Sequence, residues 1–344
     1  MGGLFRRPLL TACVLLAVGL LCVGGLYWQL LHWADTPFPA AASAGGAGAH
    51  FTLDPGDSLS SLAQQLQDQG LLDERRRLLV LARMLALDTK LQAGEYRFEA
   101  GLTPRALLLK LNRGDVVTYS FRIIEGVTVA QLLAQLAAEP RLQHLLQATD
   151  VQALHSELGL QSAFAEGMFF PDTYQYRSGD SDKVLLLRAH QAMLEQLQQA
   201  WKTRAEDLVI RSPEEAMILA SIIEKETGLA SDRGLISQVF HKRLRERMKL
   251  QTDPTVIYAL GDSFDGNLTR AHLQLSSPFN TYRVRGLPPT PIALPSAASL
   301  RAALHPAPGE FLYFVARGDG ASQFSLTLAE HNRAVRKYQL GQAQ

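Results

Sequence analysis

The sequence predicts an α+β protein with a single N-terminal transmembrane helix, a small α/β module and a larger mixed α+β domain. Three observations support this prediction. The chain of 344 residues begins with a long uncharged apolar run, continues with alternating strand-like and helix-like segments, and changes to longer helical patterns after Pro140. We therefore divide it into four parts, residues 1–33, 34–50, 51–120 and 121–344. The length of the chain is compatible with this division.

The apolar run at the start predicts a membrane anchor. No charged residue occurs between Arg7 and Asp35, and residues 9–27 are long enough for one crossing, which takes about 20 residues. Arg6 and Arg7 precede the run, so the positive-inside rule places the N terminus in the cytoplasm and everything after the run outside it. The alternative is a cleaved signal peptide, but the run is longer than a usual signal core, and the cleavable residues 40–44 lie far from its end.

Residues 34–50 are rich in alanine, glycine and proline, which is typical of a flexible tether.

Composition excludes several kinds of partner and site. The formal net charge of +1 gives no reason to expect nucleic acid as a partner. Cys13 and Cys22 are the two cysteines and both lie in the apolar run, so the remainder can form no internal disulfide and no cysteine metal site. Without a close histidine pair, a GxSxG elbow or a glycine-rich phosphate loop, we expect no metal and no cofactor.

One pattern occurs three times between residues 51 and 136. An aromatic residue opens a short alternating stretch, a glycine follows, and a serine or threonine precedes leucines at helical spacing. This pattern predicts a strand, a glycine turn, an N-cap and an amphipathic helix. The glycines are Gly56, Gly101 and Gly126, and the expected caps are Ser58, Thr103 and Thr128.

A further helix is predicted over residues 73–87, so residues 51–98 should form strand, helix, helix and strand in that order. This order resembles the LysM module, a small fold that binds glycans containing N-acetylglucosamine. The resemblance rests on the pattern of elements and implies glycan binding. A small α/β packing unit without a ligand is the alternative.

A mostly apolar helix in the second half carries the best candidate for catalysis. Ser212 is the expected N-cap, Pro213 occupies the first helical position and Glu215 completes a capping box. The helix should end near Thr227, because Gly228 follows it. A longer amphipathic helix is predicted before it, over residues 182–204.

Glu224 lies in the last turn of this apolar helix. It shares a helix face with Met217, Ala220 and Ser221, and the small residues among them allow that face to border a cavity. Apolar surroundings and the negative end of the helix both favour a protonated carboxyl, which a general acid needs. A solvated helix-terminal glutamate is the alternative. Glu226 should point to a different side, and Lys225 should project elsewhere.

Three other segments combine polar and aromatic side chains: residues 166–176, 251–261 and 280–295. Tyrosine, asparagine, glutamine and aspartate bind sugars by stacking and hydrogen bonds. Each segment could equally anchor a loop, and the prolines of residues 280–295 are more typical of loop shape than of ligand contact.

Five segments resemble the YceG-like (MltG) family, the endolytic murein transglycosylases of bacteria. They are residues 166–176 (EGMFFPDTYQY), 218–228 (ILASIIEKETG), 250–261 (LQTDPTVIYALG), 280–295 (NTYRVRGLPPTPIALP) and 299–332. The order of anchor, LysM-like module and later domain is similar too. The resemblance covers residues 51 to about 338.

The resemblance implies a lytic transglycosylase of the inner membrane with its catalytic domain in the periplasm. Such an enzyme cuts nascent peptidoglycan strands internally, between MurNAc and GlcNAc, and leaves a 1,6-anhydro-MurNAc end. The catalytic glutamate of the family falls on Glu224. Other motif positions, with a substrate-binding role implied, are Glu226, Gln251, Asp253, Tyr258, Asn280 and Tyr282. The chain departs from the family at Met168, where tryptophan is expected, and at Thr290 and Ser296, where glycine is common.

In this interpretation Glu224 first protonates the glycosidic oxygen and then accepts the proton of the muramic 6-hydroxyl. No second carboxylate is then required, unlike in ordinary glycosidases. Two alternatives stay open: a hydrolase in which Asp253 or Glu226 is the partner carboxylate, and a non-enzymatic glycan-binding scaffold. The resemblance also implies proximity to peptidoglycan synthases (penicillin-binding proteins) at sites of growth.

Overall fold

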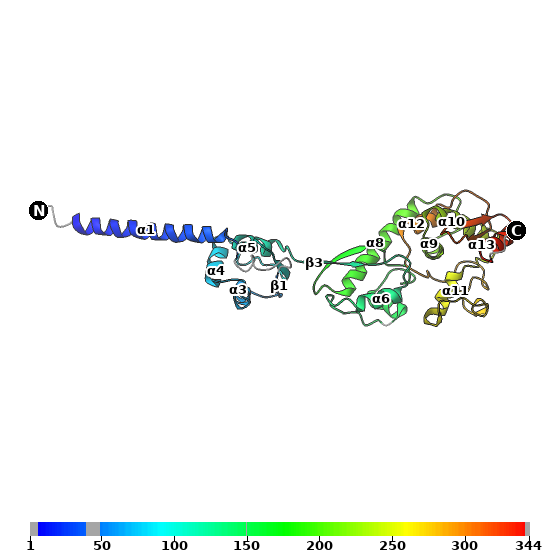
Figure 1. Cartoon of the computed structure of the whole chain (residues 1–344), viewed down its shortest axis with the longest axis horizontal. Coiled ribbons are helices and arrows are strands. Elements are labelled where there is room, and N and C mark those ends of the chain that lie inside the picture. The colour runs from blue at the N-terminus through cyan, green and yellow to red at the C-terminus, as the bar shows by residue number, and fades with distance from the viewer. Residues whose placement is uncertain (1–5, 39–48, 149, 341–344) are drawn as a thin grey trace. The chain divides into compact units, whose positions relative to one another are not determined.

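The computed structural model describes residues 6–38, 49–148 and 150–340 (Figure 1). It divides into two compact units, Met1–Tyr119 and Ser120–Gln344, which we describe separately. Most of the expected tether, residues 39–48, lies outside the described residues.

The predicted apolar helix is confirmed. Helix α1 spans Arg6–Ala34, and its part Thr11–Ala34 is long and apolar enough to cross a membrane, with a mean hydropathy of 2.0. The side chains of residues 11–29 are exposed, as expected of a helix without a protein partner. The end of the helix is different, because Ala34 and Phe38 are buried in the core of the first unit, against Trp33. The first residues of the expected tether are therefore packed.

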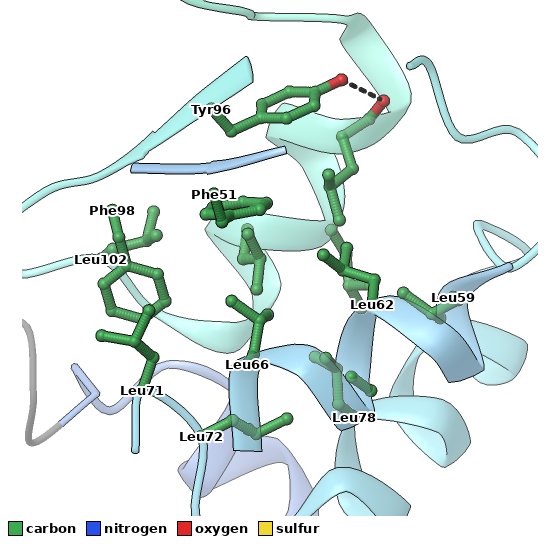
Figure 2. Packing of buried hydrophobic residues seen from close by; sticks show 14 of the residues in the cluster. Phe51, Leu59, Leu62, Leu66, Leu71, Leu72, Leu78, Tyr96, Phe98 and Leu102 are labelled. Carbon is green, nitrogen blue, oxygen red and sulfur yellow. Dashed lines mark hydrogen bonds between the residues drawn. The ribbon is translucent and has the colours of Figure 1, made fainter. Parts of the chain in front are cut away.

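The first unit has the predicted order of strand, helix, helix and strand. Its elements are β1 (Ala49–Leu53), α3 (Leu59–Asp68), α4 (Arg75–Met84), β2 (Gly94–Phe98) and α5 (Pro104–Arg113). β1 and β2 pair antiparallel, with Phe51 opposite Tyr96. Figure 2 shows how these aromatic rings cover leucines of the helices, including Leu62 and Leu66 of α3. The Tyr96 hydroxyl donates a hydrogen bond to the Leu111 carbonyl at 3.5 Å.

The repeated pattern forms the predicted local structure at all three places. Ser58, Thr103 and Thr128 each cap a helix, and each side-chain oxygen accepts a hydrogen bond from the backbone N–H three residues on. The glycines before them have φ angles of 94°, 80° and 74°, a region that side chains disfavour. Local turn and capping chemistry therefore determines these segments.

The second unit is mainly helical and contains two short sheets, each of two strands. Its helices are α6 (Val129–Ala137), α7 (Val151–Leu158), α8 (Asp182–Lys202), α9 (Pro213–Glu226), α10 (Ala230–Arg245), α11 (Asp253–Leu260), α12 (Ala297–Leu304) and α13 (Leu328–Tyr338), with 3₁₀ turns η1 (Gly261–Ser263) and η2 (His272–Gln274). β3 (Thr118–Arg122) pairs with β4 (Thr173–Arg177), and β5 (Tyr313–Ala316) pairs antiparallel with β6 (Ser322–Ser325).

Helix α9 is the centre of this unit. Every residue from 216 to 223 is buried, which a helix achieves only when neighbours cover all its faces. α12 contacts it most extensively, and α8, α10 and α11 also contact it (Figure 1). Ser212 caps its start and accepts from Glu215 N at 3.3 Å, as predicted. The buried helix therefore positions its C-terminal end rigidly, and that end carries Glu224 and Glu226.

Candidate active site

The Glu224 carboxyl binds the start of another helix. Its Oε2 accepts a hydrogen bond from Ser296 N at 2.9 Å and a second, short one from Ser296 Oγ. Ser296 is the N-cap of α12, and its Oγ also accepts from Ser299 N at 3.2 Å. The helix start presents an N–H group and partial positive charge to the carboxyl. The expectation of an apolar setting was therefore incomplete, because this polar partner comes from a segment 72 residues away.

The small residues behind Glu224 do not leave an open space at their positions. Ala220 and Ser221 are fully buried. Ser221 Oγ donates to Ile218 O at 2.7 Å and accepts from Ile292 N at 3.0 Å. Ser221 thus fixes the proline-rich loop that leads to Ser296, rather than bordering a cavity as expected.

A second loop lies beside Glu224. A Cβ on Gly126 would lie 3.8 Å from Glu224 Cγ, so the glycine brings the loop backbone close to the carboxylate side chain. Lys225 Nζ donates to Gly126 O at 3.0 Å. Gly126 N donates to Leu294 O, and Leu294 N to Val127 O, both at 2.8 Å. Lys225 therefore anchors one of two paired loops that flank Glu224.

Glu226 points to a different side, as predicted. It lines a cavity of about 530 Å³, the Glu226 cavity, together with Gln251, Asp253 and Tyr282. Thr252 Oγ1 donates a short hydrogen bond to Glu226 Oε1, and Tyr282 Oη donates to Asp253 Oδ1 at 2.5 Å. β5, β6, α13 and Arg243 complete its walls. Four of the predicted site residues are thus brought together, and Glu224 does not line this cavity.

Burial raises the pKa of Glu226 to about 7, and the charge of Asp253 adds to this, while the Thr252 hydrogen bond and the Arg243 charge oppose it. Burial also raises the pKa of the Tyr282 hydroxyl above its usual range. Gln251 has a φ of 50°, unusual for a residue with a side chain. The Glu226 cavity therefore contains a carboxyl that exchanges its proton near neutral pH and a strained backbone, features that are enriched at functional sites.

Tyr258 and Asn280 have positions that differ from those of the other predicted residues. Tyr258 Oη donates to Glu166 Oε2 at 3.1 Å. Asn280 is fully buried, and its amide donates to Leu273 O at 3.0 Å and Leu275 O at 2.8 Å. Both side chains are engaged in holding the protein together, and neither lines the Glu226 cavity.

Glu166 is a residue whose role the sequence did not indicate, although it opens the segment 166–176. It is 2% exposed, and its Oε1 accepts from Val129 N, the first residue of α6, at 3.0 Å. Burial raises its pKa to about 7, against the hydrogen bonds from Val129 and Tyr258. Glu166 thus joins α6 to α11 through a buried carboxyl.

Stability should fall as the pH rises through the range in which Glu166 titrates. Its pKa is near 4.5 in the unfolded chain and about 7 in the folded protein, so folding favours the protonated carboxyl. The contribution is fully present below pH 4.5 and is lost as the pH rises to about 7. Chemical denaturation of the wild type and of Glu166→Gln at about pH 5 and pH 8 measures it. The loss between these values should be smaller in the variant; an equal loss would assign it to other groups.

The described part of the chain contains no group of three or more His, Cys, Asp or Glu side chains that could hold a metal ion. What distinguishes the site is a pair of glutamates at one helix end, each with its own hydrogen-bond partner.

The model of the YceG-like family matches residues 51–337. The chain belongs to the YceG-like family. This confirms the resemblance that its five segments carry, and the match includes Glu224, both flanking loops and every lining residue of the Glu226 cavity except Gln339.

Two named relatives resemble the chain over about 70% of its length. A Bacillus subtilis (strain 168) relative named endolytic murein transglycosylase is 34% identical over 265 residues, which cover 72% of this chain and 73% of the relative. A Streptococcus pneumoniae (strain D39) relative of the same name is 27% identical over 285 residues, covering 73% of this chain and 51% of the relative.

A crystal structure of a putative YceG-like protein from Listeria monocytogenes at 2.6 Å has a similar fold. The TM-score is 0.52 at 27% sequence identity, and the alignment covers 84% of this chain and 99% of the Listeria chain. The architecture described above is thus that of the YceG-like family.

Proposed function

We propose that this member of the YceG-like family is an endolytic murein transglycosylase. It cleaves nascent peptidoglycan strands between MurNAc and GlcNAc and leaves 1,6-anhydro-MurNAc ends. Its support is the family match over residues 51–337 and the 34% identity to the B. subtilis enzyme of that name. The structural observation that carries the proposal is the Glu224 carboxyl, presented at the end of a buried helix and oriented by Ser296.

Glu224 is the proposed acid and base. Protonated, it gives its proton to the glycosidic oxygen as the bond to the anomeric carbon breaks. The resulting carboxylate then accepts the proton of the muramic 6-hydroxyl, whose oxygen bonds to the anomeric carbon and closes the anhydro ring. The carboxyl ends the reaction protonated, as it began, and no water is consumed.

The positions of the other candidate carboxyls support this single-carboxyl chemistry. Glu226 and Asp253 belong to a cavity that Glu224 does not line, where Glu226 accepts a hydrogen bond from Thr252 and Asp253 accepts one from Tyr282. We propose that the Glu226 cavity binds a part of the substrate away from the reacting bond. In this proposal Tyr258 and Asn280 support the walls, through Glu166 and the η2 segment respectively.

Cleavage of purified glycan strands in ¹⁸O-labelled water tests the reaction type. Intramolecular attack should give ends one water lighter than a reducing MurNAc end, without incorporated label. A hydrolase that pairs Glu224 with Asp253 or Glu226 would give labelled reducing ends. A non-enzymatic scaffold would leave the strands intact.

We further propose that α1 anchors the protein in the inner membrane, with the N terminus in the cytoplasm and residues 121–344 acting as the catalytic domain in the periplasm. The apolar segment Thr11–Ala34 and the arginines before it support this topology. A reporter enzyme that works only in the periplasm should be active when it is fused after His50. Activity of a reporter that works only in the cytoplasm would contradict the orientation.

The first unit is proposed to be a LysM-like glycan-binding module, on the ground of its strand–helix–helix–strand order. Sedimentation of residues 34–119, which keep the buried Ala34 and Phe38, with insoluble peptidoglycan measures such binding, and failure of the folded module to sediment would leave it a packing unit. Penicillin-binding proteins are the proposed protein partners. Crosslinking in cells that carry the wild-type chain checks this proposal. Recovery of the crosslinked chain without penicillin-binding proteins would contradict it.

A further inference from the structure

Three helices of the second unit line a cavity that is open to solvent and that the proposed chemistry does not use. Its volume is about 780 Å³, and it lies where α8, α10 and α12 pack side by side (Figure 1). α8 contributes Gln196 and Gln199, α10 contributes Arg233, and α12 contributes Arg301 and His305. The other lining residues are alanine, glycine and threonine. We call it the cationic cavity.

The ionisable groups of the cationic cavity are all basic, and no aspartate or glutamate is among its lining residues. Among the described residues, Arg233 and Arg301 have no ion-pair or side-chain hydrogen-bond partner. The Nε of Arg233 is buried and unpartnered. A buried guanidinium N–H without an acceptor is unfavourable, and an anion that binds the Arg233 guanidinium would lower that cost. Charge and hydrogen-bonding capacity therefore both indicate an anionic ligand.

The first turn of α12 connects the cationic cavity to the residue that binds the proposed acid. Ala297 and Ala298, in the first turn of α12, line it, and the preceding residue is Ser296, which binds Glu224. It shares no lining residue with the Glu226 cavity. A group attached to the sugar that undergoes cleavage could therefore reach it.

We propose that the cationic cavity is a subsite for the carboxylates of the peptide stems on the glycan strand. This inference rests on the proposed function. The stem is attached to the lactyl group of MurNAc, the sugar whose bond is cut, and it carries free carboxylates. Guanidinium groups bind carboxylates through paired, charge-assisted hydrogen bonds. The glutamine amides can bind peptide groups of the stem, and the alanines and Gly234 leave room for its methyl groups.

Two substrates separate the effect of the stem from that of the glycan: strands that carry their peptides, and the same strands denuded by an amidase. For the wild type we expect a KM about tenfold lower with peptide-bearing strands, because hydrogen bonds to charged groups contribute about that factor or more. In the double variant Arg233→Gln, Arg301→Gln the ratio of the two KM values should fall toward one while kcat with peptide-bearing strands is kept. Arg177→Gln, an exposed arginine of β4, is the matched control and should keep the wild-type ratio.

A wild-type ratio near one, or a double variant that keeps the wild-type ratio, would overturn the subsite. Calorimetry with the free tetrapeptide stem gives a second readout that needs no catalysis: the wild type should bind it and the double variant should not. If neither strand is cleaved, the proposed function fails, and the calorimetry still decides the subsite. Inorganic phosphate is the competing probe. Phosphate that binds the wild type as tightly as the stem and displaces it would make the cavity a general anion site and refute the peptide assignment.

Discussion

Replacing Glu224 with glutamine should reduce strand cleavage by at least about 100-fold while the protein stays folded. General acid–base catalysis contributes roughly 10²–10⁴-fold, and in the proposed mechanism one carboxyl serves both proton transfers. The amide keeps the size of the side chain and can still accept hydrogen bonds from Ser296 through its oxygen. The rate of cleavage of purified strands, with thermal melting as a check on folding, measures the effect.

Glu226→Gln is the matched control, because it makes the same change at the same helix end. It should cost much less activity, since Glu226 lines a cavity that Glu224 does not line and residues two apart do not share a helix face. Glu226 is also the strongest rival for the acid, because its pKa is about 7. Near-normal cleavage by the Glu224 variant, or a larger loss at Glu226, would transfer the catalytic role to Glu226.

Gly167→Ala should lower the free energy of unfolding by about 2–5 kcal/mol, the sum of a conformational and a steric cost. Gly167 has a φ of 81°, and an added Cβ would lie 2.7 Å from Pro291 Cβ. A left-handed backbone costs a side chain about 1–2 kcal/mol, and an extra methyl group in a packed site costs about 1–3 kcal/mol. Because Pro291 precedes Ile292, which Ser221 holds, cleavage should fall too.

Gly179→Ala separates the two costs. Gly179 has a φ of 84°, but nothing lies within 4 Å of an added Cβ. It should therefore show the conformational cost alone when both variants are compared by urea denaturation. Equal losses of unfolding free energy in the two variants would mean that the loop around Pro291 accommodates the added methyl group without a steric cost.

The parts of the fold that local chemistry determines could be predicted from the sequence. The caps Ser58, Thr103, Thr128 and Ser212 each act within three residues of their own position. The sequence therefore indicated where these helices begin. It also indicated the buried helix that carries Glu224, because its apolar residues are nearly continuous.

The parts of the site that depend on distant segments could not be predicted. The bond between Glu224 and Ser296 joins residues 72 apart, and that between Glu166 and Tyr258 joins residues 92 apart. Contacts between residues so far apart produce no periodic pattern in the sequence. For the same reason the motif that includes Asn280 gave no sign that its amide is consumed by the carbonyls of Leu273 and Leu275.

The contact between Ser296 and Glu224 also determines which oxygen can move a proton. Both hydrogen bonds from Ser296 end on Oε2, so in the proposed mechanism Oε1 is the oxygen left to hold and pass on the proton. A glycosidic oxygen that Glu224 protonates would then approach Oε1. In that mechanism the Ser296 contact makes a symmetric carboxyl directional, with one oxygen for the protein and one for the strand.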